Sequence, residues 1–160
     1  MYQRLGQNSP LTQGEIIDAC PVLAWVRQNS GWTATESSER VLVLTQACDL
    51  ENTRTMRVQV AVVHEARKLV EAGLLTARLI EDSIRRHKVY GWYFLPSDSH
   101  FPESIVDLRD VHTVPRELLV ELIASGKRVI AISTPYREHL AQHFTTTYAR
   151  IGLPEPYTTD

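Results

Sequence analysis

Polar side chains follow directly on a continuous apolar run in the stretch VLVLTQACDLEN, which covers residues 41–52. Gln46, Cys48 and Asp49 place an amide, a thiol and a carboxylate where a buried strand would end, which is a rigid position for working groups. His64 follows the next apolar run, RVQVAVV, and could converge with Cys48 and Asp49. A thiol beside an imidazole can act as a nucleophile, because the imidazole lowers the pKa of the thiol.

The same residues also have a purely structural interpretation. Cys48 would then be a small core residue, which is the favoured interpretation for this thiol. Asp49 would cap the turn that follows, as Asp commonly does, and neither interpretation of it is preferred. One Cys, one His and one Asp lack the short ligand spacing of a zinc site, so no metal is expected there.

Two histidines lie four residues apart in the segment that is expected to form the last helix. His139 and His143 would share one helix face and could bind one metal ion together. No third ligand lies near them in the sequence, so a solvated helix flank is the favoured interpretation. The motifs GxGxxG, Walker A, HExxH and CxxC are all absent, and no cofactor is expected.

Cations and aromatic rings are interleaved in RRHKVYGWYF, residues 85–94. This mixture suits single-stranded nucleic acid, because bases stack on the rings while the cations contact phosphates. The side chains that would do so are Arg85, Arg86, Lys88, Tyr90 and Trp92. A helix C-terminus followed by a core strand explains the same segment and is the favoured interpretation.

The composition is that of an ordinary globular domain of 160 residues, with 43% hydrophobic and 22% charged side chains. Seventeen basic against nineteen acidic residues give a net charge of −2, unlike the strong basic excess of proteins that mainly grip phosphate backbones. No apolar run reaches the length of a membrane span, so no membrane partner is expected. The start, MYQRLGQNSP, has no apolar signal region, and Cys20 and Cys48 are expected to be reduced thiols in the cytoplasm.

Periodicity predicts an α+β domain, with strands preceding and flanking the helices. Residues 15–26 predict two short strands or one bent edge strand, since Pro21 interrupts them, and residues 28–39 have the composition of a loop. Further strands are predicted over 40–45, 57–63, 89–95 and 105–114, with a turn over 50–55. Helices are predicted over 65–88, with a division at Gly73, from Pro115 to Ser125, and from Thr134 onward. The predicted organisation is an irregular arm over 1–13, a single domain over 14–152 and a tail over 153–160.

Four segments in this order resemble the PemK/MazF-like toxins, a family of small bacterial endoribonucleases. The matching segments are GEII (14–17), RVLVLTQ (40–46), VQVAVV (58–63) and SIVDLRDVHTVPRELL (104–119), which together span about half the chain. The resemblance implies a small SH3-like β-barrel with a C-terminal helix, to which residues 65–88 add a helical insertion. It also implies a toxin–antitoxin or phage-defence setting and the possibility of a homodimer.

The family's catalytic pair is not preserved at the matching positions. Glu39 stands at the position of the family's arginine, with Arg40 one residue later, and His64 stands at the position of its threonine. An offset of one residue turns a strand side chain to the other face. We therefore expect a module that binds nucleic acid or protein, with weakened or lost ribonuclease activity. The alternative is an active, metal-independent endoribonuclease with a rebuilt site of Arg40, Gln46, Cys48, Asp49 and His64.

Overall fold

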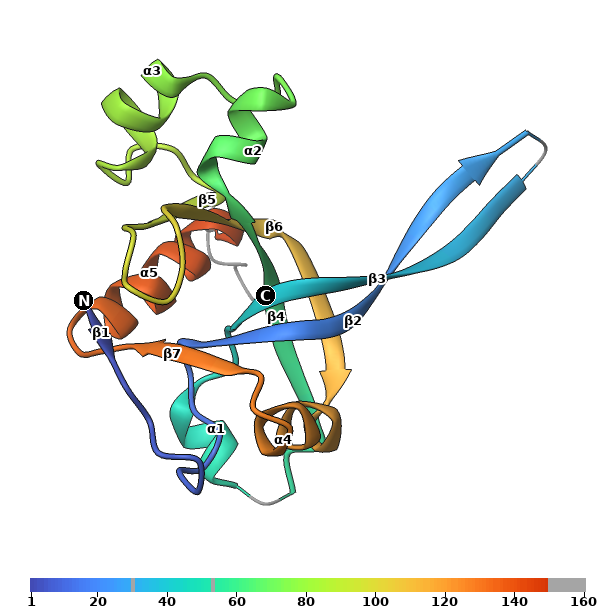
Figure 1. Ribbon diagram of the computed structural model, residues 1–160, viewed down its shortest axis with the longest axis vertical. Helices are drawn as coiled ribbons and strands as arrows, with labels where there is room; N and C mark the ends of the chain where they lie inside the picture. Colours follow the sequence, from blue (N-terminus) through green and yellow to red (C-terminus); the bar gives the residue numbers. More distant parts are fainter. Residues whose placement is uncertain (30, 53, 150–160) are drawn as a thin grey trace, which may run out of the picture.

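The computed structural model describes residues 1–29, 31–52 and 54–149, so the predicted tail over 153–160 lies outside the described residues. Within these ranges, seven strands form one antiparallel sheet in the order β1-β7-β2-β3-β4-β6-β5 (Figure 1). The strands are β1 (Tyr2–Gln3), β2 (Glu15–Gln28), β3 (Gly31–Val43), β4 (Arg57–Glu65), β5 (Trp92–Leu95), β6 (Ser104–Pro115) and β7 (Arg128–Ile132). The helices are α1 (Ala47–Glu51), α2 (Ala66–Glu71), α3 (Ala77–Leu79), the π-helical turn η1 (Ile80–Ile84), α4 (Arg116–Ala124) and α5 (Tyr136–Tyr148).

The central part of the sheet is buried on both faces, and successive side chains of its strands enter two different cores. Leu42 joins the core that packs under α5, where Leu140 is fully buried. Val41 and Val43 join the second core, in which α4 contributes Leu119 and Ile123. The continuous apolar run of β3 therefore reflects burial on two sides, and the mixed fold with an antiparallel sheet confirms the coarse fold prediction.

The two edges of the sheet approach each other through side chains. The Tyr2 hydroxyl of β1 donates a hydrogen bond to the Pro96 carbonyl, directly after β5, at 2.7 Å. Its ring also packs edge-on against Phe101 at a centroid distance of 5.3 Å. Among the described residues, no ladder joins β1 to β5, so the sheet is curled but not closed.

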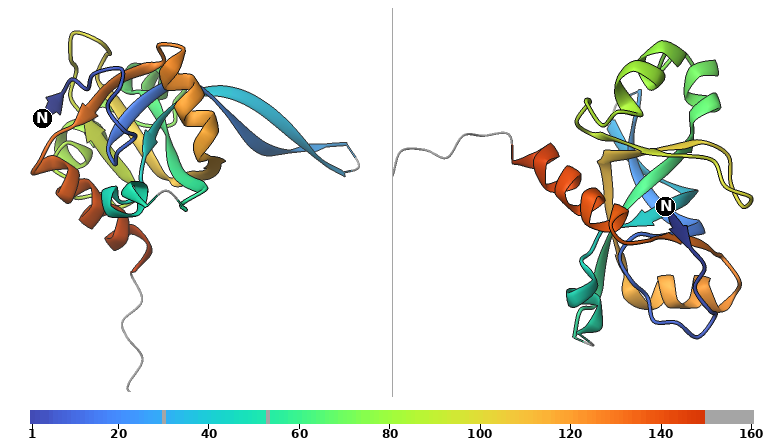
Figure 2. Two further views of the ribbon diagram at one scale, coloured as in Figure 1. Left: turned by 90° about the horizontal axis from the view of Figure 1, so that it is seen from below. Right: turned by 90° about the vertical axis from the view of Figure 1, so that its left-hand side faces the viewer.

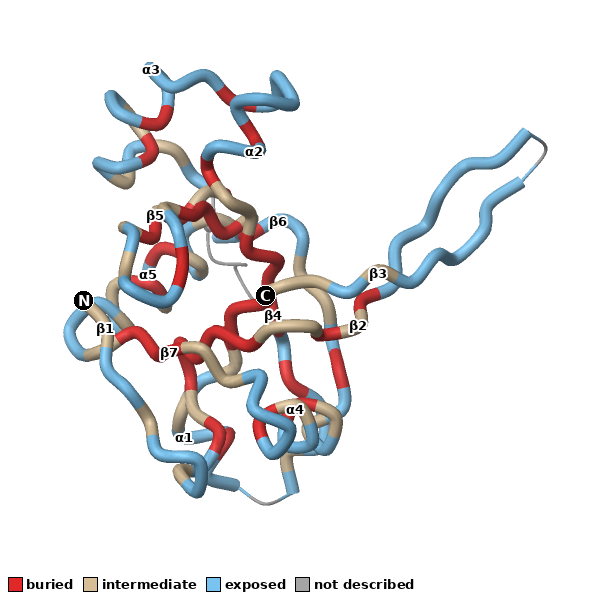
Figure 3. The backbone as a smooth tube through the Cα atoms, in the orientation of Figure 1, coloured by how far each residue is buried: buried red, intermediate tan, exposed pale blue. Residues whose placement is uncertain are grey.

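The prediction of a loop over residues 28–39 is wrong, because Gln28 still belongs to β2 and residues 31–39 belong to β3. The outer parts of β2 and β3 pair from Cys20 opposite Glu39 to Gln28 opposite Gly31 and form a two-stranded arm (Figure 2). The arm projects from the sheet and is exposed along most of its length (Figure 3). Both faces of this ribbon are in contact with solvent, so its sequence does not alternate between apolar and polar residues. Its Ser, Thr and Glu residues therefore give it the composition of a loop.

β2 is one bent strand, which was one of the two alternatives for residues 15–26. Its pairing with β3 shifts between Ile17 and Cys20, and Ala19 between them has a positive φ of 58°. Such a bulge bends a strand and increases its twist. The bend marks the point where the arm leaves the sheet.

The segment over 65–88 contains α2, α3 and η1 and divides at Gly73, as predicted, but Glu65 still belongs to β4 and the helical part ends at Ile84. Gly73 has a φ of 70°, a conformation that glycine adopts without steric cost, and it separates α2 from α3. Leu69, Ile80 and Ile84 bury this insertion against Ile105 of β6. No helix of the described ranges is long and apolar enough to span a lipid bilayer.

Candidate functional site

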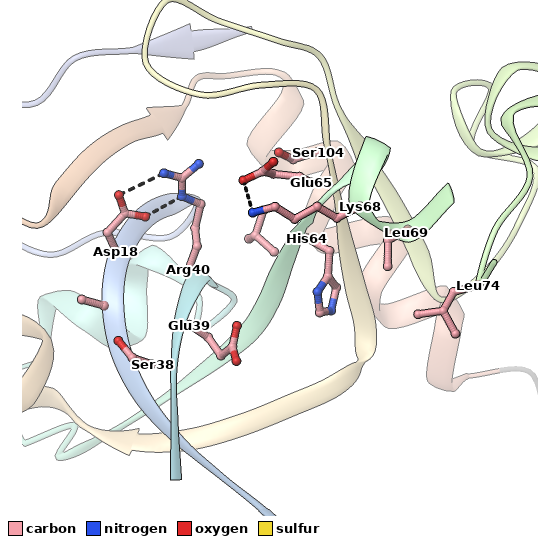
Figure 4. Close-up of a pocket in the computed structure, with 12 residues that line it drawn as sticks. Asp18, Ser38, Glu39, Arg40, His64, Glu65, Lys68, Leu69, Leu74 and Ser104 are labelled. Carbon is pink, nitrogen blue, oxygen red and sulfur yellow. Dashed lines mark hydrogen bonds and ion pairs between the residues drawn. The ribbon is translucent and has the colours of Figure 1, made fainter. Parts of the chain in front are cut away.

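A groove of about 510 Å³ lies where the arm leaves the sheet, and α2 closes its other side (Figure 4). β2, β3 and β4 deliver its polar side chains, and α2 adds a lysine. The polar residues that matter for its chemistry are Asp18, Glu39, Arg40, His64, Glu65 and Lys68. The groove therefore contains Arg40, which lies one residue after the position of the resembled family's arginine. It also contains His64, which lies at the position of the family's threonine.

Strand pairing explains why Arg40 and His64 share this groove. Val41 of β3 lies opposite Val62 of β4 in an antiparallel ladder. Arg40 precedes Val41 in β3, and His64 follows Val62 by two residues in β4. Because the two strands are antiparallel, both residues lie at the same end of the ladder. The sequence offset of one residue at Arg40 does not remove its side chain from the groove.

Ion pairs engage both cations of the groove. Arg40 donates two hydrogen bonds to Asp18, from Nε at 2.5 Å and from Nη2 at 3.0 Å. These bonds raise the pKa of Arg40 above its ordinary value, and the charge of Glu65 adds to the effect. Lys68 Nζ donates to Glu65 Oε1 at 2.7 Å.

The formal charge of the groove is slightly acidic. Among its described lining residues, the carboxylates are Asp18, Glu39 and Glu65, whereas the cations are Arg40 and Lys68. Three negative and two positive groups leave one net negative charge, with His64 left aside. A polyanion gains little from such a surface, because its phosphates would have to displace carboxylates from their partners.

The expected convergence of Cys48 and Asp49 with His64 is not observed. Leu44 N–H donates to the Gln59 carbonyl at 2.8 Å, so the end of β3 meets the start of β4. His64 lies five residues farther along β4, which corresponds to roughly 16 Å. The prediction brought together the C-terminal ends of two successive strands, and such ends meet only when the strands are parallel.

Gln46, Cys48 and Asp49 instead lie on the surface at α1, which replaces the first part of the predicted turn over 50–55. Asp49 lies in the first turn of α1, where a carboxylate suits the positive end of the helix dipole. The Cys48 thiol is exposed and contacts Gln46 Oε1 at 3.7 Å, so its interpretation as a core residue is wrong. Leu50 is the residue of α1 that enters the core.

The two thiols should differ strongly in reactivity. Cys20 is buried, and burial raises the pKa of its thiol to about 11, whereas Cys48 is exposed. Because the thiolate is the reactive form, we expect the native protein to release one equivalent of thiolate rapidly from an aromatic disulfide reagent, and a second only on unfolding. Cys48→Ser should remove the rapid phase. A rapid phase that persists in Cys48→Ser would contradict the burial of Cys20.

The cations and aromatic rings of residues 85–94 do not form one continuous binding surface. Arg85 donates to Glu103 at 2.5 Å and lies over the Phe94 ring at 5.2 Å. Trp92 is half-buried, and the guanidinium of Arg109 covers its ring at 4.3 Å. The ion pair and the covered ring compete with the binding of phosphates and bases. Arg86, Lys88 and Tyr90 are exposed.

Three histidines meet in a cluster of which the sequence indicated only two members. His143 is only 7% exposed, so its interpretation as part of a solvated flank is wrong. His139 and His143 of α5 lie beside His87, which follows η1 and has a positive φ of 53°. The spacing of His139 and His143 was the only available signal, because their third neighbour is more than fifty residues away in the chain. Tyr93 packs against all three rings.

The groove is lined by an imidazole and by carboxylates, the kinds of group that general acid–base chemistry uses. Its cations are held by carboxylates, and the arm beside it carries exposed aromatic side chains. No protein-family model matches this chain, and no curated protein matches it. The groove and the arm are therefore the features from which a function can be inferred.

Proposed function

We propose that this chain is a divergent PemK/MazF-like protein of a bacterial toxin–antitoxin or phage-defence system. It acts in the cytoplasm as a protein-binding module with weakened or lost ribonuclease activity. The four resembling segments fall at the start of β2, at the end of β3, in β4 and in β6 with the start of α4, and these four strands are consecutive neighbours in the sheet. The curled sheet and the placement of α4 directly after β6 support an SH3-like barrel.

The pairing of the groove's cations supports the loss of ribonuclease activity. Catalysis of phosphodiester cleavage needs a cation that is free to contact the phosphate as charge develops. Arg40 is held by Asp18 in a two-bond ion pair, and Lys68 is held by Glu65. His64 replaces the hydroxyl that the family provides at the matching position.

The arm is the observation that carries the proposed binding role. Trp25 lies opposite Ala34 and Arg27 lies opposite Trp32, so both tryptophans are on one face as diagonal neighbours. Their exposed fractions are 72% and 65%. Exposed tryptophans are characteristic anchors of protein interfaces, in which a few aromatic residues contribute most of the binding energy.

Charge favours a protein over a nucleic acid as the partner of the arm. Arg27 and Glu36 balance each other on the tryptophan face. A nucleic-acid surface would instead show a local excess of cations around the rings. In the proposed setting, the partner is the protein encoded beside this chain, and a homodimer through the same face is an alternative outcome of the test.

We expect the double variant Trp25→Ser/Trp32→Ser to bind the partner at least 100-fold more weakly than the parent protein, because each anchor contributes about 2 kcal/mol or more. The measurement is calorimetric titration with the purified product of the adjacent gene, together with sedimentation to determine the oligomeric state. The matched control is Thr33→Ser/Thr35→Ser, which changes the opposite face of the arm and should bind as the parent does. Equal binding by both double variants, or binding of RNA alone with strong salt dependence, would overturn the protein-binding role.

The joint presence of Arg40 and His64 in the groove favours a second candidate, an active endoribonuclease. His64 would act as a general acid or base beside Glu39 and Glu65, a role that typically contributes 10²–10⁴-fold. We expect no cleavage when purified protein is incubated with mixed RNA in a metal chelator. Cleavage by the parent and by Asp49→Ala, but not by His64→Ala, would establish this second function and contradict the lost activity.

A further inference from the structure

The three histidine rings described above form a compact cluster between α5 and the end of the helical insertion. The ring centroids are separated by 4.5 Å for His87–His139, 5.7 Å for His87–His143 and 6.2 Å for His139–His143. Three imidazoles that bind one tetrahedral zinc ion have ring centres about 5 Å apart. The observed separations lie on both sides of this value.

Two ring nitrogens of the cluster are buried without a hydrogen-bond partner, namely His87 Nδ1 and His143 Nε2. A buried polar atom without a partner is costly and calls for an explanation in terms of strain, function or a missing ion.

Tyr93 orients the third ring. Its hydroxyl donates to the Tyr136 carbonyl at 3.2 Å, which uses its one hydrogen. The contact of 3.3 Å between the same oxygen and His139 Nδ1 then has the imidazole as donor. A proton on Nδ1 leaves Nε2 of His139 as the nitrogen with a free lone pair. Hydrogen bonding of the second ring nitrogen in this way is a regular feature of metal-bound histidine.

We propose that His87, His139 and His143 bind one zinc ion, with a water molecule as the fourth ligand. Among the described residues, no group of three such side chains is already placed to hold a metal ion. Formation of the site therefore requires rotation of the imidazoles about their side-chain bonds. The metal would connect α5 to the insertion after η1 and give the two orphaned nitrogens a partner.

The test is calorimetric titration of the untagged, metal-free, full-length protein with zinc chloride at neutral pH. We expect saturable binding of one equivalent, and a rise in the melting temperature of about 5–10 °C at a hundredfold excess over Kd. His87→Asn and His139→Gln should each weaken binding by more than about 100-fold, whereas Tyr93→Phe should weaken it by about 10–100-fold. Asn is chosen at position 87 because it tolerates a positive φ.

The matched control is His112→Gln, which removes a histidine that pairs with Asp110 outside the cluster and should bind zinc as the parent does. Cobalt(II) in place of zinc should give the visible absorption of a tetrahedral site in the parent and in His112→Gln, but not in His87→Asn or His139→Gln. Circular dichroism of each metal-free variant establishes that it is folded. Absence of saturable binding by the parent, or equal binding by His87→Asn and His112→Gln, would overturn the proposal.

Discussion

Replacement of Arg128 by methionine is expected to lower the free energy of unfolding by about 3–5 kcal/mol near neutral pH. The Arg128 guanidinium donates from Nε to Glu15 Oε2 at 2.9 Å and from Nη2 to Glu15 Oε1 at 3.3 Å. The side chains are 7% and 0% exposed, respectively. Loss of the arginine leaves a carboxylate in the protein interior without its counter-charge, and this dominates the expected cost.

The same guanidinium also holds the N-terminal segment, which raises the expected cost further. Nη1 donates to the Gly6 carbonyl at 2.6 Å, and Nη2 donates to the Ser9 carbonyl at 2.8 Å. Glu15 in turn accepts the backbone N–H of Thr12 at 2.7 Å. Residues 6–12, which lie between β1 and β2, are thus attached to the sheet through one ion pair. Methionine has about the volume of the arginine stem but none of its donors.

The effect of Arg128→Met should depend on pH in a defined direction. Burial raises the pKa of Glu15 even in the parent protein, although Thr12 and Arg128 oppose the shift. Without Arg128, the pKa of the folded state rises further above the unfolded value. The unfolded state then binds fewer protons than the folded state in this window, so stability falls as the pH rises through it. The deficit of the variant should therefore be largest near neutral pH and shrink as the pH approaches the ordinary value of a carboxyl group.

Urea unfolding followed by circular dichroism at several pH values measures this deficit. The control is the double variant Glu15→Gln/Arg128→Met, which keeps an acceptor for Thr12 but removes the buried charge. It should recover at least half of the lost stability and show a flatter pH dependence. A cost below about 1 kcal/mol for Arg128→Met, or the same cost at every pH, would show that the pair is not buried in solution.

The ion pair of Glu15 and Arg128 could not be predicted from the sequence. The strands over 40–45, 57–63 and 105–114 could be predicted because apolar, β-branched residues recur with the period of a buried strand. No local pattern connects Glu15 with Arg128, since 113 residues separate them. Their contact exists only once β7 has paired with β2, and that pairing is a property of the whole sheet.

Only part of the candidate site could be predicted from the sequence. Arg40 and His64 could be placed together because they occupy neighbouring strands at positions that the family resemblance selected. Cys48 was wrongly included in the site, because the apolar pattern of two strands does not tell whether they run parallel or antiparallel. The arm was missed because a two-stranded ribbon in solvent has no buried face, and only burial produces alternation.

The His87 cluster illustrates a different limit. His139 and His143 have the spacing of a helical pair, and sequence alone gave no reason to bury either of them. The left-handed turn at His87 brings its ring onto α5 after the π-helical turn η1. Histidine is unusual but tolerated in that conformation, and no signal in RRHKVYGWYF predicted it. The contact of His87 with the two histidines of α5 therefore follows only from the three-dimensional structure.

The replacement of Leu140 by alanine is expected to cost about 2–5 kcal/mol of unfolding free energy. Leu140 is 0% exposed and belongs to the core under α5, together with Ile132 and Tyr93. Removal of its branched end loses burial and leaves a cavity, because β7 and β5 on the other side of the side chain are fixed by the sheet. The measurement is urea unfolding monitored by the far-ultraviolet circular dichroism of the helices.

The matched control is Leu74→Ala, which makes the same chemical change at a side chain that is 69% exposed in the insertion. That variant should stay within about 0.5 kcal/mol of the parent, as surface substitutions usually do. A cost at Leu140 as small as that at Leu74 would mean that α5 is not docked on the sheet. The histidine cluster depends on the same docking, because α5 carries two of its three rings. Zinc should therefore stabilise Leu140→Ala by at most as much as the parent, since part of its binding energy must first restore the packing of α5.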